Sequence, residues 1–225
     1  MQEHVLSTPA SIDDAARSLT TAEISDALDA LRLPGSALGI RHVAGAKKLM
    51  GPAFTVRLVP ISQDAPGTVG DFIDDVPPGA VVVVDNGGRP DCTVWGGILS
   101  QVAARRGVGG TVVHGACRDI AEADAAGYAL YASASFMRTG KDRVQVEAVN
   151  GPVSLGDVRV MPGDLVCGDA DGVVVVPASR VEAVLAKALH TREREQRILD
   201  AALDGVPLRE ARQQFGYHTL QRPGH

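Results

Sequence analysis

Residues 111–127 read TVVHGACRDIAEADAAG, and this stretch contains the transition on which the fold depends. The apolar, β-branched run at 111–113 predicts a buried strand, and Arg118 and Asp119 follow where that strand is expected to end. A guanidinium beside a carboxylate at this place has two interpretations. One is a surface salt bridge or a helix cap. The other is a site that holds an anion and a metal ion together.

Strand and helix signals alternate upstream of this stretch. The turn residues Pro77-Pro78-Gly79 lead into a β-branched run at 80–84, which predicts a strand buried on both faces. Residues 93–106 carry an apolar stripe at helical spacing, and the glycines at 107–110 end it. Strand, helix and strand within roughly 35 residues have the size of one crossover unit. The sequence therefore predicts an α/β fold.

Nearer the N-terminus, the sequence first predicts a helix. Thr20 and Glu23 have capping-box spacing, and Pro34-Gly35 ends the apolar face that follows them. Gly51-Pro52 then opens a predicted strand at 53–59. In the second half, strands are predicted at 158–160, 165–167 and 173–176, with Asp171-Gly172 as the hairpin turn between the last two.

A long C-terminal helix is predicted from Ser179, which has capping-box spacing to Glu182, as far as Leu203. Its middle, 192–197, is charged on every side, so it is expected to be solvated or to lie against another subunit. The tail at 215–225 has no clear period. Without a linker or a repeat, one domain is predicted over 1–225, with a core at about 20–205 and the C-terminal helix and tail at 179–225.

Composition excludes several classes of protein. The net charge is −5 and the basic residues form no stripe, so nucleic acid is not an expected partner. No apolar segment approaches the roughly 20 residues that span a bilayer, and the N-terminus lacks a signal-peptide pattern. The three widely spaced cysteines predict reduced thiols rather than disulfides or structural zinc. A cytoplasmic protein is expected.

For several motifs a structural role fits the sequence better than a binding function. Residues 169–172 resemble part of a calcium loop but fit a hairpin turn better, because Arg180 stands where the loop needs its final Glu. The glycines at 107–110 follow a helix and precede a strand, which is the reverse of a dinucleotide loop. Residues 83–88 lack the spaced glycines of a methyltransferase. His114 alone fits a structural role, although it stands near Arg118.

Gly96 and Gly97 lie in the first turn of the predicted helix, where each costs roughly 1 kcal/mol relative to Ala. They leave the first-turn N–H groups unobstructed, which favours anion binding. Close packing of the helix on the sheet would also favour glycine. Local sequence leaves both interpretations open.

Taken together, these segments resemble the RraA-like family, which includes the class II 4-hydroxy-4-methyl-2-oxoglutarate aldolases. The resemblance covers about residues 20–205 and rests on separated blocks in the family's order, at 51–56, 78–85, 95–99, 106–110, 115–119, 162–164 and 169–177. It implies a single domain with a mixed sheet and an αββαβ-type core, assembled as a homotrimer or hexamer with sites between subunits. It also implies a lyase that gives pyruvate from 4-hydroxy-2-oxo acids or from oxaloacetate. Some members instead inhibit ribonuclease E, so a non-catalytic regulator is the alternative.

The resemblance also assigns site residues. Asp119 matches the ligand of a divalent cation, Mg²⁺ or Mn²⁺, and Arg118 matches the arginine that binds the substrate. The two charges are then expected to face different parts of a metal–substrate complex, not each other. The backbone N–H groups of the segment made of Gly96, Gly97, Ile98 and Leu99 match those that hold the pyruvyl carboxylate.

The resemblance also implies two further acidic residues in the active site. One, which holds a metal-bound water, would stand at Gly97, where this chain has no side chain. This departure predicts better decarboxylation than aldol cleavage, because only the latter needs a base for the 4-hydroxyl proton. A second acid comes from the neighbouring subunit's C-terminal region, and Glu195 is the first candidate for it, with Glu193 second.

Overall fold

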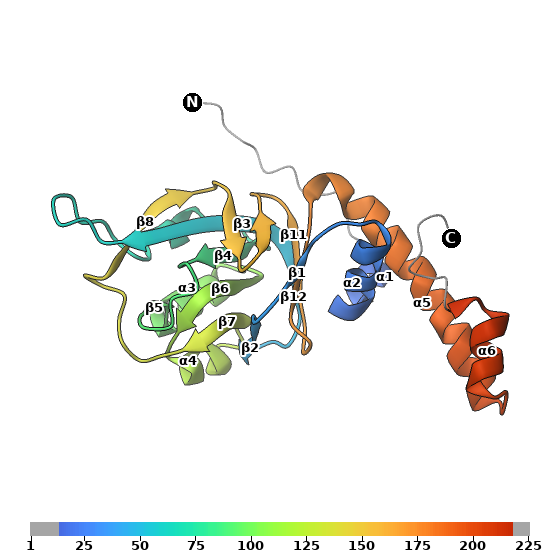
Figure 1. Cartoon of the computed structure of the whole chain (residues 1–225). Helices are drawn as coiled ribbons and strands as arrows, with labels where there is room; N and C mark the ends of the chain where they lie inside the picture. The colour runs from blue at the N-terminus through green and yellow to red at the C-terminus, as the bar shows by residue number, and fades with distance from the viewer. Residues whose placement is uncertain (1–13, 218–225) are drawn as a thin grey trace.

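The protein is described here by a computed structural model, in which residues 14–217 are placed (Figure 1). Ten strands form one mixed sheet with the order β1-β12-β11-β3-β4-β6-β7-β2; β5 pairs with β6, and β8 pairs with β3. The strands are β1 Ser36–Ala37, β2 Arg41–Ala44, β3 Leu49–Pro60, β4 Val81–Asp85, β5 Thr93–Trp95, β6 Gly110–Cys117, β7 Leu130–Ser135, β8 Val144–Val149, β9 Val153–Leu155, β10 Val158–Val160, β11 Leu165–Gly168 and β12 Val173–Val176. The helices are α1 Asp14–Ser18, α2 Thr21–Ala30, α3 Gly97–Arg105, α4 Ile120–Ala125, α5 Val181–Leu203 and α6 Leu208–Gln214, with 3-10 turns η1 Asp71–Asp75 and η2 Ala178–Arg180.

The centre of the sheet is parallel and the flanks are antiparallel, which confirms the predicted α/β single domain with a mixed sheet. β3, β4, β6 and β7 run parallel, and the β-branched residues of β4 are fully buried. Strands covered on both faces read as continuous apolar runs, which explains why β4 was visible in the sequence. The antiparallel pairing of β11 with β12 confirms the hairpin predicted at Asp171-Gly172.

The helix predicted over 93–106 is shorter than expected at its N-terminal end. Thr93–Trp95 is instead a short buried strand, β5, that pairs with the end of β6. Gly96 has extended backbone angles and acts as the N-cap of α3. Trp95 explains the difference, because it is 1% exposed, stacks on Tyr128, and donates from Nε1 to Ser100 Oγ at 3.0 Å. Its tertiary contacts override the helical period, and α3 begins two residues after it.

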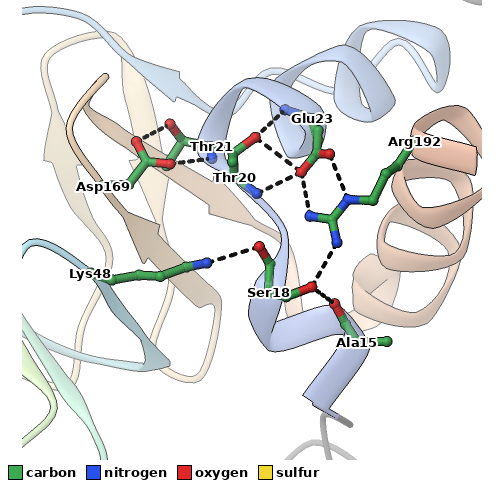
Figure 2. A network of polar contacts seen from close by, with 8 residues as sticks. All are labelled: Ala15, Ser18, Thr20, Thr21, Glu23, Lys48, Asp169 and Arg192. Carbon is green, nitrogen blue, oxygen red and sulfur yellow. Dashed lines mark hydrogen bonds and ion pairs between the residues drawn. The ribbon is translucent and has the colours of Figure 1, made fainter. Parts of the chain in front are cut away.

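The capping box at the start of α2 is confirmed, and it belongs to a larger network (Figure 2). Thr21 donates from its backbone N–H and its hydroxyl to the two carboxylate oxygens of Asp169, at 2.7 and 2.6 Å. On the other side, Arg192 of α5 forms two hydrogen bonds of 2.6 Å to the carboxylate of Glu23 and a third to Ser18 Oγ. Side chains on α2, α5 and the β11–β12 hairpin therefore fix these elements together.

Two expectations about α5 were wrong. Ser179 and Glu182 do not form a capping box, because residues 178–180 form a 3-10 turn and Arg180 takes the N-cap position without a side-chain hydrogen bond. The polar middle of the helix does have a partner in its own chain, since Arg192 binds Glu23 of α2. The end at Leu203 is confirmed. Beyond α2 the helix continues outward (Figure 1), and Leu199 and Leu203 are 49% and 77% exposed there.

Residues 14–217 contain no helix that is long and apolar enough to cross a membrane. The three cysteines are buried and unpaired, as predicted from their spacing. Of the tail at 215–225, residues 218–225 lie outside the described part of the chain.

Candidate active site

A pocket of about 600 Å³ lies where α3 begins and β6 ends. Its floor is β5, and its walls come from the loop before η1 and from the loop after β7. The residues that line it include Gly96, Gly97, Ile98, Leu99, Arg118 and Asp119, together with Asp71, Asp74, Lys141 and Asp142. The structure therefore brings the six pocket residues expected from the sequence of this one chain into a single concave surface.

Asp119 has an unusual backbone that aims its side chain at α3. Its φ of 55° and ψ of 45° are left-handed, and it forms the N-cap of α4. Aspartate tolerates this conformation better than most residues, and such outliers gather at functional sites. Oδ2 accepts a 2.9 Å hydrogen bond from the backbone N–H of Gly97. The first turn of α3 thus holds the carboxylate that the sequence assigned to metal binding.

The two glycines are explained by this close approach. A Cβ on Gly96 would lie 2.8 Å from Oδ2 of Asp119, and a Cβ on Gly97 would lie 3.2 Å from the Cβ of Asp119. Any side chain at position 96 would displace the carboxylate. The sequence left two interpretations of these glycines open, anion binding and close packing on the sheet. The structure shows close packing, but the residue that the glycines pack against is Asp119. The anion that the Gly97 N–H contacts is Asp119 itself, whereas the N–H groups of Ile98 and Leu99 remain in the first turn, where no intrahelical acceptor exists.

Arg118 is held beside the pocket by three contacts. Its N–H donates to Trp95 O at 2.9 Å, and Nη1 donates to Met137 O at 3.3 Å. Nε lies 3.4 Å from Oδ2 of Asp119, so the expectation that the two charges do not face each other is wrong for this structure. Both side chains are 38% exposed, and an ion pair so accessible to water contributes only ~0–1 kcal/mol. The pair is therefore open to exchange for stronger ligands.

One oxygen of Asp119 suits a hard divalent cation. Oδ2 contacts Gly97 and Arg118, whereas Oδ1 has no partner in residues 14–217. The N–H of Gly97 orients the carboxylate in the way that outer-shell hydrogen bonds orient metal ligands. Residues 14–217 of this chain hold no group of three His, Cys, Asp or Glu side chains that could bind a metal. A single carboxylate fits Mg²⁺, which keeps several waters and binds through one or two protein carboxylates plus substrate oxygens.

The remaining candidates lie away from the pocket of their own chain. Glu195 stands on α5, where burial, together with the nearby Asp26 and Glu23, raises its pKa. Glu193 is exposed on the same helix. His114 faces Asp85 at 3.4 Å and does not line the pocket, in agreement with a structural role.

Two residues in or beside the pocket had no clear signal in the sequence. A Cβ on Gly97 would lie 3.2 Å from the Cβ of Glu122, so a second acid borders the place of the missing one. Its spacing of three from Asp119 puts both in the first turn of α4, which was the only available hint. The other residue is Lys141, which lines the pocket from the loop after β7.

Comparison with known proteins agrees with this fold. The sequence profile of the RraA-like family (Aldolase/RraA) matches residues 21–175, and the chain belongs to that family. Protein DlpA of Legionella pneumophila is 38% identical over 201 residues, which are 88% of this chain but 32% of DlpA, so the chain spans about a third of that relative. "Putative 4-hydroxy-4-methyl-2-oxoglutarate aldolase" of Halalkalibacterium halodurans is 36% identical over 174 residues, 76% of this chain and 79% of the relative.

Two solved structures show the same fold. An uncharacterized protein from Pseudomonas syringae pv. tomato superposes with a TM-score of 0.86 at 37% identity, over 92% of this chain and 96% of that one. RraAS2 of Streptomyces coelicolor, described as an unusual member of the RNase ES inhibitor RraA protein family, has a TM-score of 0.73 at 27% identity, over 81% and 93% of the two chains. The family therefore contains proteins named as aldolases and proteins named as ribonuclease inhibitors.

Proposed function

We propose that this protein is a divalent-metal-dependent carbon–carbon lyase acting on small 2-oxo acids. The observation that carries the proposal is the placement of Asp119, whose Oδ2 is fixed by the N–H of Gly97 and whose Oδ1 is left free beside Arg118 in the pocket. Asp119 would hold Mg²⁺ or Mn²⁺, which would supply Lewis-acid polarisation of the substrate's 2-oxo group.

The chain's own groups would bind and orient the substrate. The guanidinium of Arg118 offers a planar, permanently charged fork to the carboxylate and the 2-oxo oxygen of the pyruvyl end. The N–H groups of Ile98 and Leu99 lie at the pocket wall, where a helix N-terminus favours a carboxylate. Binding of substrate would replace the weak contact between Arg118 and Asp119, so that each charge gains a stronger partner.

Two reactions follow from this arrangement. In oxaloacetate the bond between C3 and C4 breaks, CO₂ leaves, the electron pair enters the enolate of pyruvate, and C3 then takes a proton. In 4-hydroxy-4-methyl-2-oxoglutarate a base removes the 4-hydroxyl proton and the bond between C3 and C4 breaks, which gives one pyruvate and one pyruvate enolate; C3 of the enolate then takes a proton to give the second pyruvate. General-base catalysis typically raises the rate of such a step by ~10²–10⁴-fold. Position 97 has no carboxylate that could organise the water acting as the base. We therefore propose that decarboxylation is the faster reaction.

The active form is proposed to be a homotrimer or hexamer. Ile98 and Met137 are 81% and 74% exposed beside the pocket, which supports a neighbouring chain at this rim. That neighbour would contribute an acid from its own α5, with Glu195 as first candidate and Glu193 as second.

A ribonuclease regulator is the second candidate, favoured by the similarity to RraAS2. Two assays run in parallel on the same purified protein separate the two functions. Mg²⁺ and oxaloacetate are added to the purified protein and pyruvate is measured, while ribonuclease E cleavage of an RNA is followed with and without the protein. Metal-dependent pyruvate release supports the lyase. Inhibition of the ribonuclease without pyruvate release supports the regulator.

A further inference from the structure

Ser100 of α3 carries a buried hydroxyl that the proposed reaction does not use. The residue is 0% exposed, and its Oγ lies 3.0 Å from Nε1 of Trp95 and 3.1 Å from Gly96 O. The indole N–H can only donate, so Oγ accepts from it and the single hydroxyl hydrogen is left to donate. Gly96 O is the acceptor that this hydrogen meets. Trp95 therefore sets the direction in which the Ser100 hydroxyl donates.

The carbonyl of Gly96 belongs to a peptide unit whose other side faces Asp119. A trans peptide is planar, and its C=O and N–H point in opposite directions. Gly96 O accepts from the hydroxyl of Ser100 at 3.1 Å and from the N–H of Ser100 at 3.0 Å. The N–H of Gly97, on the opposite side of the same unit, donates to Oδ2 of Asp119 at 2.9 Å. Holding the carbonyl therefore aims the N–H at the carboxylate.

This peptide unit needs an anchor because it joins two glycines. If the unit turned over, the φ of Gly97 would change from the ordinary helical value of about −60° to about +120°, which glycine adopts and other residues avoid. The close approach of Asp119 favours glycine on both sides, since a Cβ on Gly96 would lie 2.8 Å from Oδ2 and a Cβ on Gly97 3.2 Å from the Cβ of Asp119. The glycines that admit the carboxylate thus leave its hydrogen-bond donor free to turn away.

We propose that Ser100 is a positioning residue for Asp119. Its hydroxyl, directed by the indole of Trp95, holds the peptide between Gly96 and Gly97 in the orientation that keeps the N–H of Gly97 on Oδ2. With Oδ2 held, the orientation of Oδ1 is fixed as well. Ser100 does not line the pocket, so it acts only through this peptide. The benefit to metal binding rests on the proposed function, whereas the orientation of the peptide does not.

The alternative role of Ser100 is only to satisfy the buried indole N–H, in which case Ser100→Ala lowers stability and nothing else. Thr111→Val is the matched control for that effect. The hydroxyl of Thr111, a residue that is 0% exposed and does not line the pocket, lies 2.8 Å from the hydroxyl of Tyr128. Its removal also takes the partner from a buried polar group, at a similar cost in stability. Ser100→Thr keeps the hydroxyl, because Thr Oγ1 can also bond the carbonyl four residues earlier in a helix.

The orientation of the peptide can be measured without metal or substrate. The sequence has three Gly-Gly pairs, at 87–88, 96–97 and 109–110. Glycine labelled with ¹³C at its carbonyl and ¹⁵N at its amide therefore gives carbonyl-edited NMR signals from the amides of Gly88, Gly97 and Gly110 alone. The hydrogen-exchange rate of the Gly97 N–H reports how often its bond to Asp119 opens. Gly88, whose N–H donates to His114 O at 3.1 Å, is the internal reference.

The affinity of the same variants for Mn²⁺ is measured by paramagnetic resonance. In Ser100→Ala, the exchange rate of the Gly97 N–H and the Kd for Mn²⁺ are each expected to rise about 2- to 10-fold, the equivalent of one net hydrogen bond, with unchanged exchange at Gly88. Thr111→Val should leave both quantities at their wild-type values, and Ser100→Thr should lie closer to the wild type than Ser100→Ala does.

Three results overturn the inference: an unchanged Gly97 exchange rate in Ser100→Ala, an equal rise in Thr111→Val, or an unchanged Kd in Ser100→Ala when the wild type binds Mn²⁺. Faster Gly97 exchange confined to Ser100→Ala, in a protein whose wild type binds no Mn²⁺, upholds the inference and refutes only the metal site.

Discussion

The backbone N–H of Gly97 donates a 2.9 Å hydrogen bond to Oδ2 of Asp119, and this contact joins the first turn of α3 to the N-cap of α4. It places the carboxylate so that one oxygen is held by the protein and the other has no partner among residues 14–217. The proposed metal site depends on this division between the two oxygens.

Replacement of Asp119 by Asn tests the metal ligand with the least disturbance. Asn also tolerates a left-handed backbone, and its side-chain oxygen still accepts from the N–H of Gly97. The variant loses the charge, so its affinity for Mn²⁺, measured by paramagnetic resonance, is expected to fall at least about 100-fold. Asp124→Asn on the same helix is the matched control, because the carboxylate of Asp124 accepts a hydrogen bond from the N–H of Gly45 and does not line the pocket. Equal Mn²⁺ affinity in wild type and Asp119→Asn would remove Asp119 from the site.

Gly97→Asp tests the missing acid, and the structure changes how the variant must be designed. A Cβ at this position would lie 3.2 Å from those of Asp119 and Glu122, so the new carboxylate would meet two others. The double variant Gly97→Asp, Glu122→Ala relieves this crowding. It is expected to raise the ratio of aldolase to decarboxylase kcat/KM by at least about tenfold and to tighten Mg²⁺ binding.

The control for this comparison is Glu122→Ala alone, which should leave the ratio near that of the wild type. Two results would contradict this prediction: a double variant with the wild-type ratio, or a wild type that already favours the aldol substrate. In either case Glu195 or a water would supply the base, and Gly97 would be needed for packing alone.

The substitution Glu23→Gln removes the ion pair between Glu23 and Arg192 but keeps the cap of α2. Gln still completes the capping box, but it loses the charge that Arg192 binds, and the side chains of this pair are only 18% and 30% exposed. The free energy of unfolding at neutral pH is expected to fall by about 0.5–1.5 kcal/mol. Urea unfolding measures it, with Glu147→Gln as control, because the Arg57–Glu147 pair is about half exposed and should matter less.

The same variant should change the acid dependence of stability. Burial raises the pKa of Glu23, but hydrogen bonds from Arg192 and Thr20 outweigh it and hold the pKa below its ordinary value. The charged carboxylate therefore adds stability above its unfolded-state pKa, and this contribution is lost as pH falls through the lower folded-state pKa. As pH falls below the ordinary pKa of a glutamate, about 4.5, the wild type should lose more stability than Glu23→Gln. Parallel pH profiles would mean that the ion pair contributes nothing.

The oligomer is tested by light scattering at micromolar concentration, where a trimer or a hexamer is expected. Glu195→Gln should then lower activity more than Glu193→Gln with no change of mass, because Glu195 is the first candidate for the acid supplied to the neighbouring site. A monomer with full activity would contradict both parts of this prediction.

Sequence reasoning succeeded where the signal was local. The β-branched run of β4, the capping box of α2, the hairpin turn at Asp171-Gly172 and the position of Arg118 could all be predicted from neighbouring residues. These features depend on backbone preferences and on periodicity, which are properties of a short segment.

Apart from the missing cap at the start of α5, where a 3-10 turn intervenes, the features that were missed depend on contacts between distant segments. Asp169 binds Thr21 across 148 positions, and no local pattern marks such a partner. Trp95 belongs to a strand because β6 lies beside it, and Arg192 finds Glu23 because α5 packs on α2. For the same reason the contact between Gly97 and Asp119 appeared only in the structure, although both residues had been singled out.

The most direct test of the central claim is the rate of pyruvate release from oxaloacetate at saturating Mg²⁺, compared among wild type, Asp119→Asn and Asp124→Asn, with and without EDTA. The account predicts that release by the wild type and Asp124→Asn exceeds that of the protein-free control and falls to the control rate when EDTA is added, and that release by Asp119→Asn stays at the control rate throughout. Release above the protein-free rate that persists in EDTA, or full activity in Asp119→Asn, would contradict a metal-dependent lyase built on this carboxylate.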